Sequence, residues 1–588
     1  MRSARDVLSA ASFEVRQFRI LTRHFFLRLF KNDLVDFEDQ MKERVIGVLA
    51  ILAVFSGLLA YVYLGQYGYM PDKGQSWIEK MFIMTFFMLI MGLLAILEWD
   101  NIHPDARDYS NLNPLPLRAR TILAAKFTSL LLFVGLFALS LNLLSSPFFI
   151  FLLPWGRSPS LFFFLGHAAV HILIMFLACF FSFFLYVVLL GLFQSLLGSK
   201  IFGKASTYLR SLFLVLQLFL ILTYLRILVY GLSNLIPADR IANNFSKLGR
   251  FFDFYPPFWF TDLYESALGS PRLPFHGRYR FALIGLAVMG VVFIFSMGLS
   301  YARSMKRTRI GYKPRLRKFR WFMAAAFNGL FLRNRIQRAV FHFYRKTFRS
   351  SVFHRMRLAT FLACGLAFVP FLITMKVVRK GHLFDINLTM LSIPLILSFA
   401  LLLGLRSAAS VPVSLEANWV FRLTERPQVR HYFAGHRKAM VMTNLIPLFV
   451  LVFAVYSVLW DPPTAFNHAL YGLAISILTM EMLFIRFLKI PFSCSYLPGK
   501  EKMQVFWLPY LLGFIAYLNI TSRIELELLR SPSQFVPFVI SVFLMVAAIR
   551  AYQVFFLYKR NRIRYEEEPE PIMVGLDYKY PPHKRNQA

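Results

Sequence analysis

Long, almost unbroken apolar runs recur along the chain, and each is close to the length of a membrane-spanning helix. Such a helix needs roughly 20 mostly apolar residues. Continuous runs also exclude a membrane β-barrel, whose strands alternate apolar and polar residues. The pattern predicts an all-α polytopic membrane protein with about 12 transmembrane helices. The predicted spans are residues 45–64, 81–97, 127–146, 168–190, 209–232, 281–299, 358–375, 386–405, 439–459, 468–488, 505–520 and 535–556.

The composition agrees with a membrane protein. Of 588 residues, 57% are hydrophobic and 16% are charged, whereas soluble chains carry about 25% charged residues. So apolar a chain also excludes intrinsic disorder. Two of the predicted spans, 81–97 and 505–520, are shorter than the others. Residues 147–164 could be a re-entrant segment that continues the third span.

The net charge of +36 is sorted between the two sides of the predicted membrane. When loops are assigned alternately, roughly 50 Lys and Arg residues fall on the side of the N-terminus and roughly 14 on the other, which makes the first side cytoplasmic. Both termini are then cytoplasmic, as an even number of spans requires. The cytoplasmic segments are residues 1–44, 98–126, 191–208, 300–357, 406–438, 489–504 and 557–588.

The topology suggests a duplication. Each half opens with a basic stretch rich in aromatic residues, FRILTRHFFLRLF at 18–30 and AVFHFYRKTFRSSVFHRMR at 339–357. Residues 9–31, which include the first stretch, suit a basic amphipathic helix at the inner membrane surface, though a short helix packed on the protein itself is the alternative. Two parallel six-helix units are expected, unless the match is a coincidence of the span count. The predicted divisions are residues 1–310, 311–556 and a disordered cytoplasmic tail, 557–588.

No enzyme chemistry is predicted for the chain. Residues 198–206, GSKIFGKAS, nearly form a P-loop, but Ala205 stands where a Ser or Thr must bind magnesium. His167 and His171 share a helix face, yet zinc needs a third ligand, so a polar pair is favoured over a metal site. No nucleic-acid-binding module accompanies the basic residues. We therefore expect no metal, no cofactor and no nucleic-acid partner.

Charged residues inside predicted spans are functional candidates because burying them in a membrane is costly. Glu481 lies in the tenth span, Arg226 in the fifth and Arg550 in the twelfth. Glu481 is expected to pair with Arg226 or Arg550 in a structural ion pair, which is favoured over a role as a proton carrier.

The two long cytoplasmic loops, 98–126 and 406–438, have the composition of docking sites. Each combines aromatic anchors with charged residues, as interfaces with soluble partners do. Packing of the aromatic residues at the membrane interface is the alternative. The candidate docking residues are Trp99, Pro114, Arg118 and Arg120 in the first loop, and Glu416, Trp419, Arg422, Glu425 and Arg426 in the second.

Three stretches resemble the permease subunits of ABC-2-type ABC transporters: NPLPLRARTILAAK (113–126), GLFQSLLGSKIFGK (191–204) and LEANWVFRLTER (415–426). Two more, YPPFWFTDLYESALG (255–269) and IPFSCSYLPGK (490–500), look like segments of a large bacterial membrane-protein group related to ABC-2 permeases. The family implies six spans per unit, an amphipathic helix before the first span and a coupling element between the second and third. Two units in one chain depart from the commonest arrangement, in which two separate subunits meet.

The resemblance implies a bacterial inner-membrane exporter driven by a separate ABC ATPase subunit. That subunit would bind the ATP and dock around Trp99–Arg120 and Glu416–Arg430, and membrane lipid and further membrane subunits are compatible partners. Tyr255, Trp259 and Tyr264 mark a candidate re-entrant or gating element between the fifth and sixth spans. The alternatives are a secondary transporter or lipid flippase driven by an ion gradient, and a membrane scaffold of a multiprotein assembly.

Overall fold

The computed structural model is helical, with no β-strand among the residues that it describes. Nine helical segments in these residues are long and apolar enough to cross a membrane. The protein is therefore an all-α multi-pass membrane protein. The structure describes residues 4–30, 38–67, 76–102, 112, 114–115, 117–151, 161–233, 254–269, 277–305, 328–329, 331–378, 385–413, 418–423, 429–485, 487, 489–493 and 507–557.

Each of the nine apolar segments overlaps one predicted span, including the short span 81–97. The other three predicted spans overlap helices α2 (Glu38–Tyr67), α19 (Pro462–Leu483) and α20 (Trp507–Arg530), which are not among the nine segments. The count of twelve spans stays a prediction. The nine segments are Lys80–Leu97, Arg120–Ile150, Phe164–Gln194, Ala205–Arg226, Tyr279–Ser296, Val352–Thr374, Leu388–Ala409, Val429–Leu459 and Pro532–Phe556.

The chain divides into two compact units. The first unit comprises residues 1–321, 355–404 and 504–527, and the second comprises residues 322–354, 405–503 and 528–588. The division into six-span halves at residue 310 stays a prediction, and the predicted tail lies outside the described residues except for Leu557. The remaining helices of the first unit are α1 (Ala4–Phe30), α3 (Ser76–Leu97), α4 (Trp99–Ile102), α6 (Ala119–Phe151), α7 (Leu161–Ser233), α10 (Pro256–Ala267), α11 (Tyr279–Met305) and most of α14 (Val352–Val378) and α15 (Leu388–Ala409).

Helix α7 is a hairpin that contains two predicted spans. Phe193 and Phe213 would lie about 30 Å apart in a straight helix, yet their ring centroids are 6.1 Å apart. Tyr186 also hydrogen-bonds Gln217. The chain therefore reverses direction between the two phenylalanines. This segment includes GSKIFGKAS, which is helical here and does not form a phosphate-binding loop.

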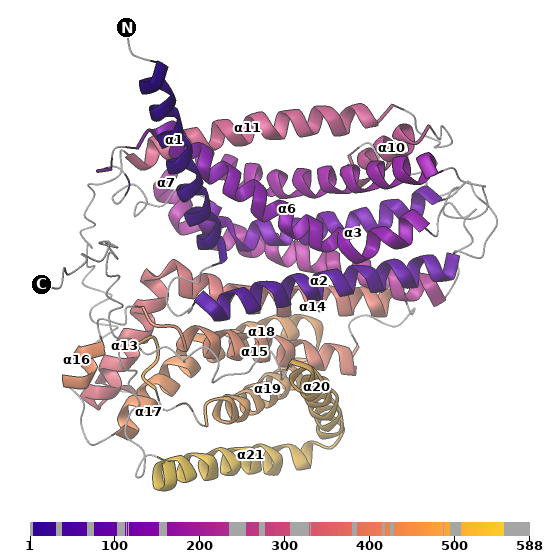
Figure 1. Ribbon diagram of the computed structural model, residues 1–588. Helices are drawn as coiled ribbons and strands as arrows, with labels where there is room; N and C mark the ends of the chain where they lie inside the picture. The colour runs from indigo at the N-terminus through magenta and orange to yellow at the C-terminus, as the bar shows by residue number, and fades with distance from the viewer. Residues whose placement is uncertain are drawn as a thin grey trace, which may run out of the picture. The chain divides into compact units, whose positions relative to one another are not determined.

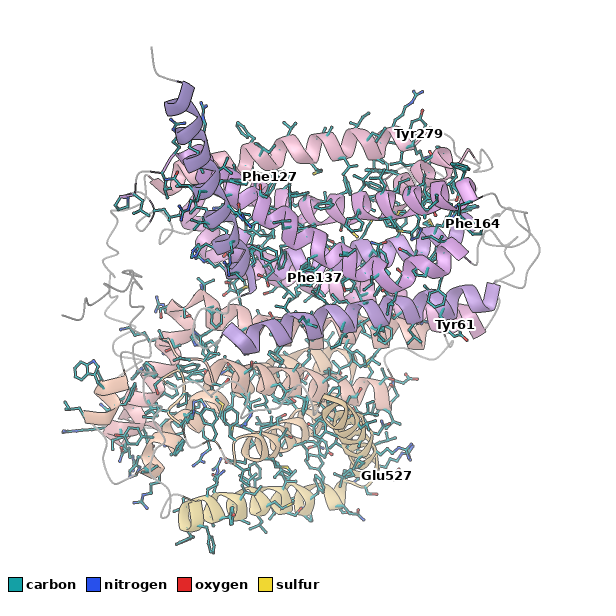
Figure 2. The ribbon with its side chains drawn as sticks, in the orientation of Figure 1. Tyr61, Phe127, Phe137, Phe164, Tyr279 and Glu527 are labelled. Atoms are coloured by element: carbon teal, nitrogen blue, oxygen red, sulfur yellow. The ribbon has the colours of Figure 1, made fainter. Side chains whose placement is uncertain are left out.

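The helices of the first unit lie side by side around a core rich in phenylalanine. Helix α3 packs along α7, and both α2 and α1 pack against α6 (Figure 1). The ends of successive helices alternate: Tyr61, Phe164 and Tyr279 lie at one end of this bundle and Phe127 towards the other (Figure 2). This alternation is what successive antiparallel spans require. The side of the bundle that faces the cytoplasm stays a prediction. Helix α6 also continues past Pro147 to Phe151, so the part of 147–164 before residue 152 extends the third span.

The second unit is built on a helix that precedes its spans. Asn334 caps α13 (Arg335–Ser350) by accepting hydrogen bonds from the amides of Ile336 and Gln337. The buried face of α13 packs on α17 (Val429–Met440). The remaining elements are α16 (Asn418–Leu423), the π-helix η1 (Val441–Leu445), α18 (Ile446–Leu459), α21 (Pro532–Tyr552) and the π-helix η2 (Gln553–Leu557).

Candidate functional site

Two side chains of the short helix α16 are its most exposed apolar groups. Trp419 is 63% exposed and Leu423 is 80% exposed. The ring of Phe421 points the other way and lies 5.3 Å, centroid to centroid, from Phe343 of α13. One ring thus holds α16 in place while Trp419 and Leu423 stay outside. We call these two residues the α16 face.

The four other docking residues predicted near α16 are described less fully. Arg422 lies on α16, and nothing is described of its side chain. Glu416, Glu425 and Arg426 lie outside the described residues. Their grouping with the α16 face therefore stays a prediction.

The first predicted docking loop differs because its aromatic anchor is not accessible. Trp99 begins α4, is only 4% exposed and belongs to the hydrophobic core of the first unit. It therefore supports the loop from inside and offers no ring to a partner. Pro114, Arg118 and Arg120 are exposed, and Arg118 forms an ion pair with Glu14 of α1. The apolar ring of Trp99 favours core packing over a surface position wherever the core can admit it.

A charged cluster lies inside the second unit, centred on Glu481 of α19. Arg550 of α21 donates from Nε to Glu481 Oε1 at 2.7 Å, and Arg437 Nη1 of α17 lies 3.7 Å from Glu481 Oε2. Arg437 also donates to Gln553 Oε1 at 2.7 Å. One carboxylate thus contacts two guanidiniums. We call Glu481, Arg437, Arg550 and Gln553 the Glu481 cluster.

Both described π-helices adjoin the Glu481 cluster. η1 begins four residues after Arg437, and η2 begins at Gln553. π-helical turns are rare and often occur at functional sites. The sequence indicated Glu481 and Arg550 because they lie in apolar runs. Arg437 and Gln553 were missed because they lie at the polar ends of their runs, where charge and amides are ordinary.

Of the two partners predicted for Glu481, Arg550 is the one that contacts it. Its ion pair with Arg550 is present, whereas Arg226 belongs to the first unit and donates to Thr374 Oγ1 at 3.3 Å. Thr374 lies on α14, so Arg226 joins α7 to α14. The expectation of an ion pair between Glu481 and Arg550 is confirmed, and the role of the pair stays a prediction.

A second polar cluster surrounds α10 in the first unit. The Tyr264 hydroxyl lies 3.1 Å from His171 Nδ1 and 3.2 Å from His167 Nε2. Lys80 of α3 pairs with Glu265 at 2.6 Å, and its ammonium lies 4.4 Å from the centre of the Tyr264 ring. The two histidines thus act as a polar pair around a tyrosine, and among the described residues no third metal-ligating side chain joins them.

Helix α10 is fixed at its start and beyond its end as well. The Tyr255 hydroxyl lies 2.8 Å from Thr85 Oγ1, and Asp262 accepts a hydrogen bond from the backbone amide of Tyr279 at 2.9 Å. Desolvation by the surrounding helices raises the pKa of Tyr255. Trp259 is half-buried and its ring lies 6.1 Å from that of Phe181. The predicted gating element is therefore a helix held among α3, α7 and α11. Sequence reasoning missed Lys80 and Glu265, because each stands at the edge of an apolar run.

Comparison of the chain with protein-family models, with curated proteins and with solved structures gives no match. The nine apolar helices define a multi-pass membrane protein. The membrane in which it resides and the process that it serves are matters of proposal.

Proposed function

We propose that the chain is the membrane-spanning permease subunit of an ATP-driven exporter in a bacterial inner membrane. A separate ATPase subunit docks on the α16 face and hydrolyses the ATP, so the chain itself is not an enzyme. The observation that carries this proposal is the exposure of Trp419 and Leu423 on a helix fixed through Phe421. A rigidly presented tryptophan is the usual anchor of a protein interface.

The contacts behind α16 supply a path for movement into the membrane. Phe421 packs on α13, and α13 is joined to α17 by Lys438, which donates to Gln337 Oε1 and to the Phe331 carbonyl oxygen, both at 2.9 Å. Helix α17 continues through η1 into α18, which lies within the apolar segment Val429–Leu459. A displacement of α16 by a partner is therefore transmitted to a spanning helix.

The loop of the first unit supplies the second contact of the ATPase. Arg118 and Arg120 are exposed at the start of α6, where two cations can form the polar rim of an interface. Arg118 is tied to α1 through Glu14. Trp99 is not part of this surface, because it is buried.

The direct test is co-purification of the full chain in mild detergent. We expect an ABC ATPase subunit to co-purify with the native chain and to be lost from the variants Trp419→Ala and Leu423→Ala. Phe466→Ala is the matched control, because Phe466 is also an exposed apolar residue, 55% accessible, and lies on α19. Recovery of the native chain without any ATPase, or equal loss of the ATPase from the control, would contradict the proposal.

One observation favours a second candidate, an ion-driven transporter that uses Glu481. A carboxylate buried between helices and next to two π-helices is a reasonable proton carrier. The two ion pairs argue against it, because protonation of Glu481 would weaken its contacts with both Arg437 and Arg550. Proton uptake into liposomes that contain the chain, under an imposed pH gradient, distinguishes the two. Uptake that Glu481→Gln abolishes would support the second candidate, and uptake that it leaves unchanged would exclude the carrier role.

A further inference from the structure

Helix α13 carries positive charge on the face opposite its contact with α17. Its buried residues lie on one side of the helix, and they are Val340, Phe341, Tyr344 and Thr347. Arg335, Arg345 and Lys346 are exposed, and residues 335–350 contain no Asp or Glu. None of these three basic residues forms an ion pair with another residue that the structure describes. We call Arg335, Arg345 and Lys346 the α13 basic face.

The α13 basic face adjoins the α16 face, and Figure 1 shows the two helices beside each other. The Phe421 ring of α16 packs on Phe343 at 5.3 Å, centroid to centroid. Phe343 precedes Lys346 by three residues, and side chains at that spacing are neighbours on a helix. Exposed apolar residues thus lie next to exposed charges. An apolar centre with a charged rim is the usual composition of a protein interface.

Helices α13 and α17 stand at the end of an apolar segment. The segment Val429–Leu459 contains 31 residues, which would be about 46 Å long as a helix, whereas the hydrocarbon core of a membrane is ~30 Å thick. Helix α17 is the polar end of this segment and carries Arg430 and Lys438. Because α13 packs on α17, we expect both helices to lie outside the hydrocarbon core, where a soluble protein can reach them.

The side chains of α13 favour an acidic protein over an anionic membrane as the occupant of the basic face. A helix that lies on a membrane binds it through an apolar face, and that of α13 is packed on α17. No large apolar side chain of residues 335–350 is exposed. Helix α1 differs, because Val15 and Ile20 are exposed among its arginines. Helix α13 thus lacks the apolar contribution to membrane binding that α1 offers.

We propose that the α13 basic face belongs to the docking surface and binds an acidic patch on the ATPase subunit, beside the site that takes Trp419. The inference rests on the proposed function, because it describes the chemistry of the same partner. Charges at the rim of an interface mainly raise the rate of association and select the partner. An ATPase subunit that docks here therefore presents carboxylates around an apolar pocket.

The first test uses the full chain together with the ABC ATPase subunit that co-purifies with it in mild detergent. A carbodiimide joins a lysine to a carboxylate in direct contact, and mass spectrometry identifies the joined peptides. We expect Lys346 to be joined to an Asp or Glu of the ATPase. Lys346→Arg is the control, because arginine keeps the charge but not the reactive amine. In this variant the ATPase should stay bound and the cross-link should be absent.

The second test measures the affinity of the ATPase for the chain. Arg345→Gln with Lys346→Gln should weaken binding about fivefold, as two surface ion pairs contribute, and should make it less sensitive to salt. The matched control is Arg280→Gln with Arg523→Gln, which removes the same charge from exposed positions on α11 and α20 and should change the affinity little. Thermal midpoints equal to that of the native chain are the check that both double variants fold.

The outcomes separate this inference from the proposed function. Loss of the ATPase from Trp419→Ala but not from Arg345→Gln with Lys346→Gln would overturn the inference and leave the proposed function standing. Equal weakening in the control, or a cross-link from Lys346 to residues 566–568 of the same chain, would also overturn it. A double variant that keeps the ATPase but loses bound phosphatidylglycerol, counted by native mass spectrometry, would show that the face binds anionic lipid. Recovery of the chain without any ATPase would contradict both proposals.

Discussion

Each unit contains a basic helix packed against the start of a later helical run, and the two contacts are made differently. In the first unit α1 packs on α6 mainly through apolar residues, including Phe25, Leu21 and Ile122. In the second unit α13 packs on α17 so closely that a Cβ atom on Gly435 would lie 2.8 Å from the Gln337 carbonyl oxygen. The contact is thus mainly apolar in one unit and tight and hydrogen-bonded in the other.

The units also differ in how they bury charge. Lys80 and Glu265 form a balanced pair in the first unit, with side chains 3% and 9% exposed. In the Glu481 cluster of the second unit one carboxylate contacts two arginines, and the side chain of Arg550 is 45% exposed. A balanced, enclosed pair suits a fixed joint between α3 and α10. A cluster with one accessible arginine can rearrange, which suits the unit that carries the proposed docking face.

The largest expected effect tests this difference in charge burial. Glu265→Gln removes the carboxylate that pairs with the enclosed Lys80 ammonium and should cost about 3–5 kcal/mol. Glu481→Gln should cost less, because Arg550 can turn to its surroundings. Thermal unfolding of both variants in detergent measures the order. Lys80→Met combined with Glu265→Leu should recover most of the loss, since apolar replacements of buried pairs are often neutral. A larger loss for Glu481→Gln would reverse the comparison.

The tight helix contact of the second unit gives the next prediction. In Gly435→Ala the new methyl group meets the backbone of Gln337, at 2.8 Å from its oxygen and 2.9 Å from its Cα, so the helices must separate. Overpacking of this kind costs about 1–3 kcal/mol. Gly166→Ala on α7 is the control, because nothing lies within 4 Å of its added Cβ. The measurement is the thermal midpoint together with hydrogen exchange of residues 335–350. Unchanged exchange there would show that α13 does not depend on this contact.

The two lysines that reach the basic helices should differ by a smaller amount. Lys438→Met removes two hydrogen bonds from a charged donor and should cost about 1 kcal/mol. Lys126→Met should cost less, because the methionine side chain is of similar length and keeps the apolar contact with the Phe25 ring. Comparison of the two thermal midpoints with that of the native chain checks the order. Equal losses would indicate that the two lysines are held in equivalent ways.

The sequence predicted the features that depend on long apolar runs, but it did not predict which individual side chains are buried by packing. Apolar runs predicted the spans, and nine of them fold as apolar helices of sufficient length. The basic helices before each half were also predicted, and both form, although α13 buries its apolar face on α17. Trp99 was expected at the surface, and the core holds it, because composition alone does not show which way a loop aromatic points.

The polar clusters show the same limit more clearly. Glu481 and Arg550 could be predicted because charge is rare within apolar runs, and their pairing is observed. Lys80, Glu265 and Arg437 stand at the ends of such runs, where charge carries no information about burial. Their partners lie far away along the chain, 185 residues apart for Lys80 and Glu265. Only the packing of α10 against α3 brings that pair together.

The smallest expected effect is a pH dependence confined to α13. Partial burial, together with the nearby Arg345 and Arg338, lowers the pKa of His342. A histidine with a lowered pKa in the folded state takes up its proton more readily after unfolding. Stability from α13 is therefore present above about pH 6.5 and declines as the pH falls below that value.

Hydrogen exchange of residues 335–350, corrected for its intrinsic pH dependence, should rise between pH 7.5 and 5.5 relative to residues 4–30. His342→Gln should remove this rise, because glutamine does not titrate. If the rise persists in the variant, another titrating group at the contact between α13 and α17 causes it. Protonation of His342 would then not explain the difference between α13 and α1.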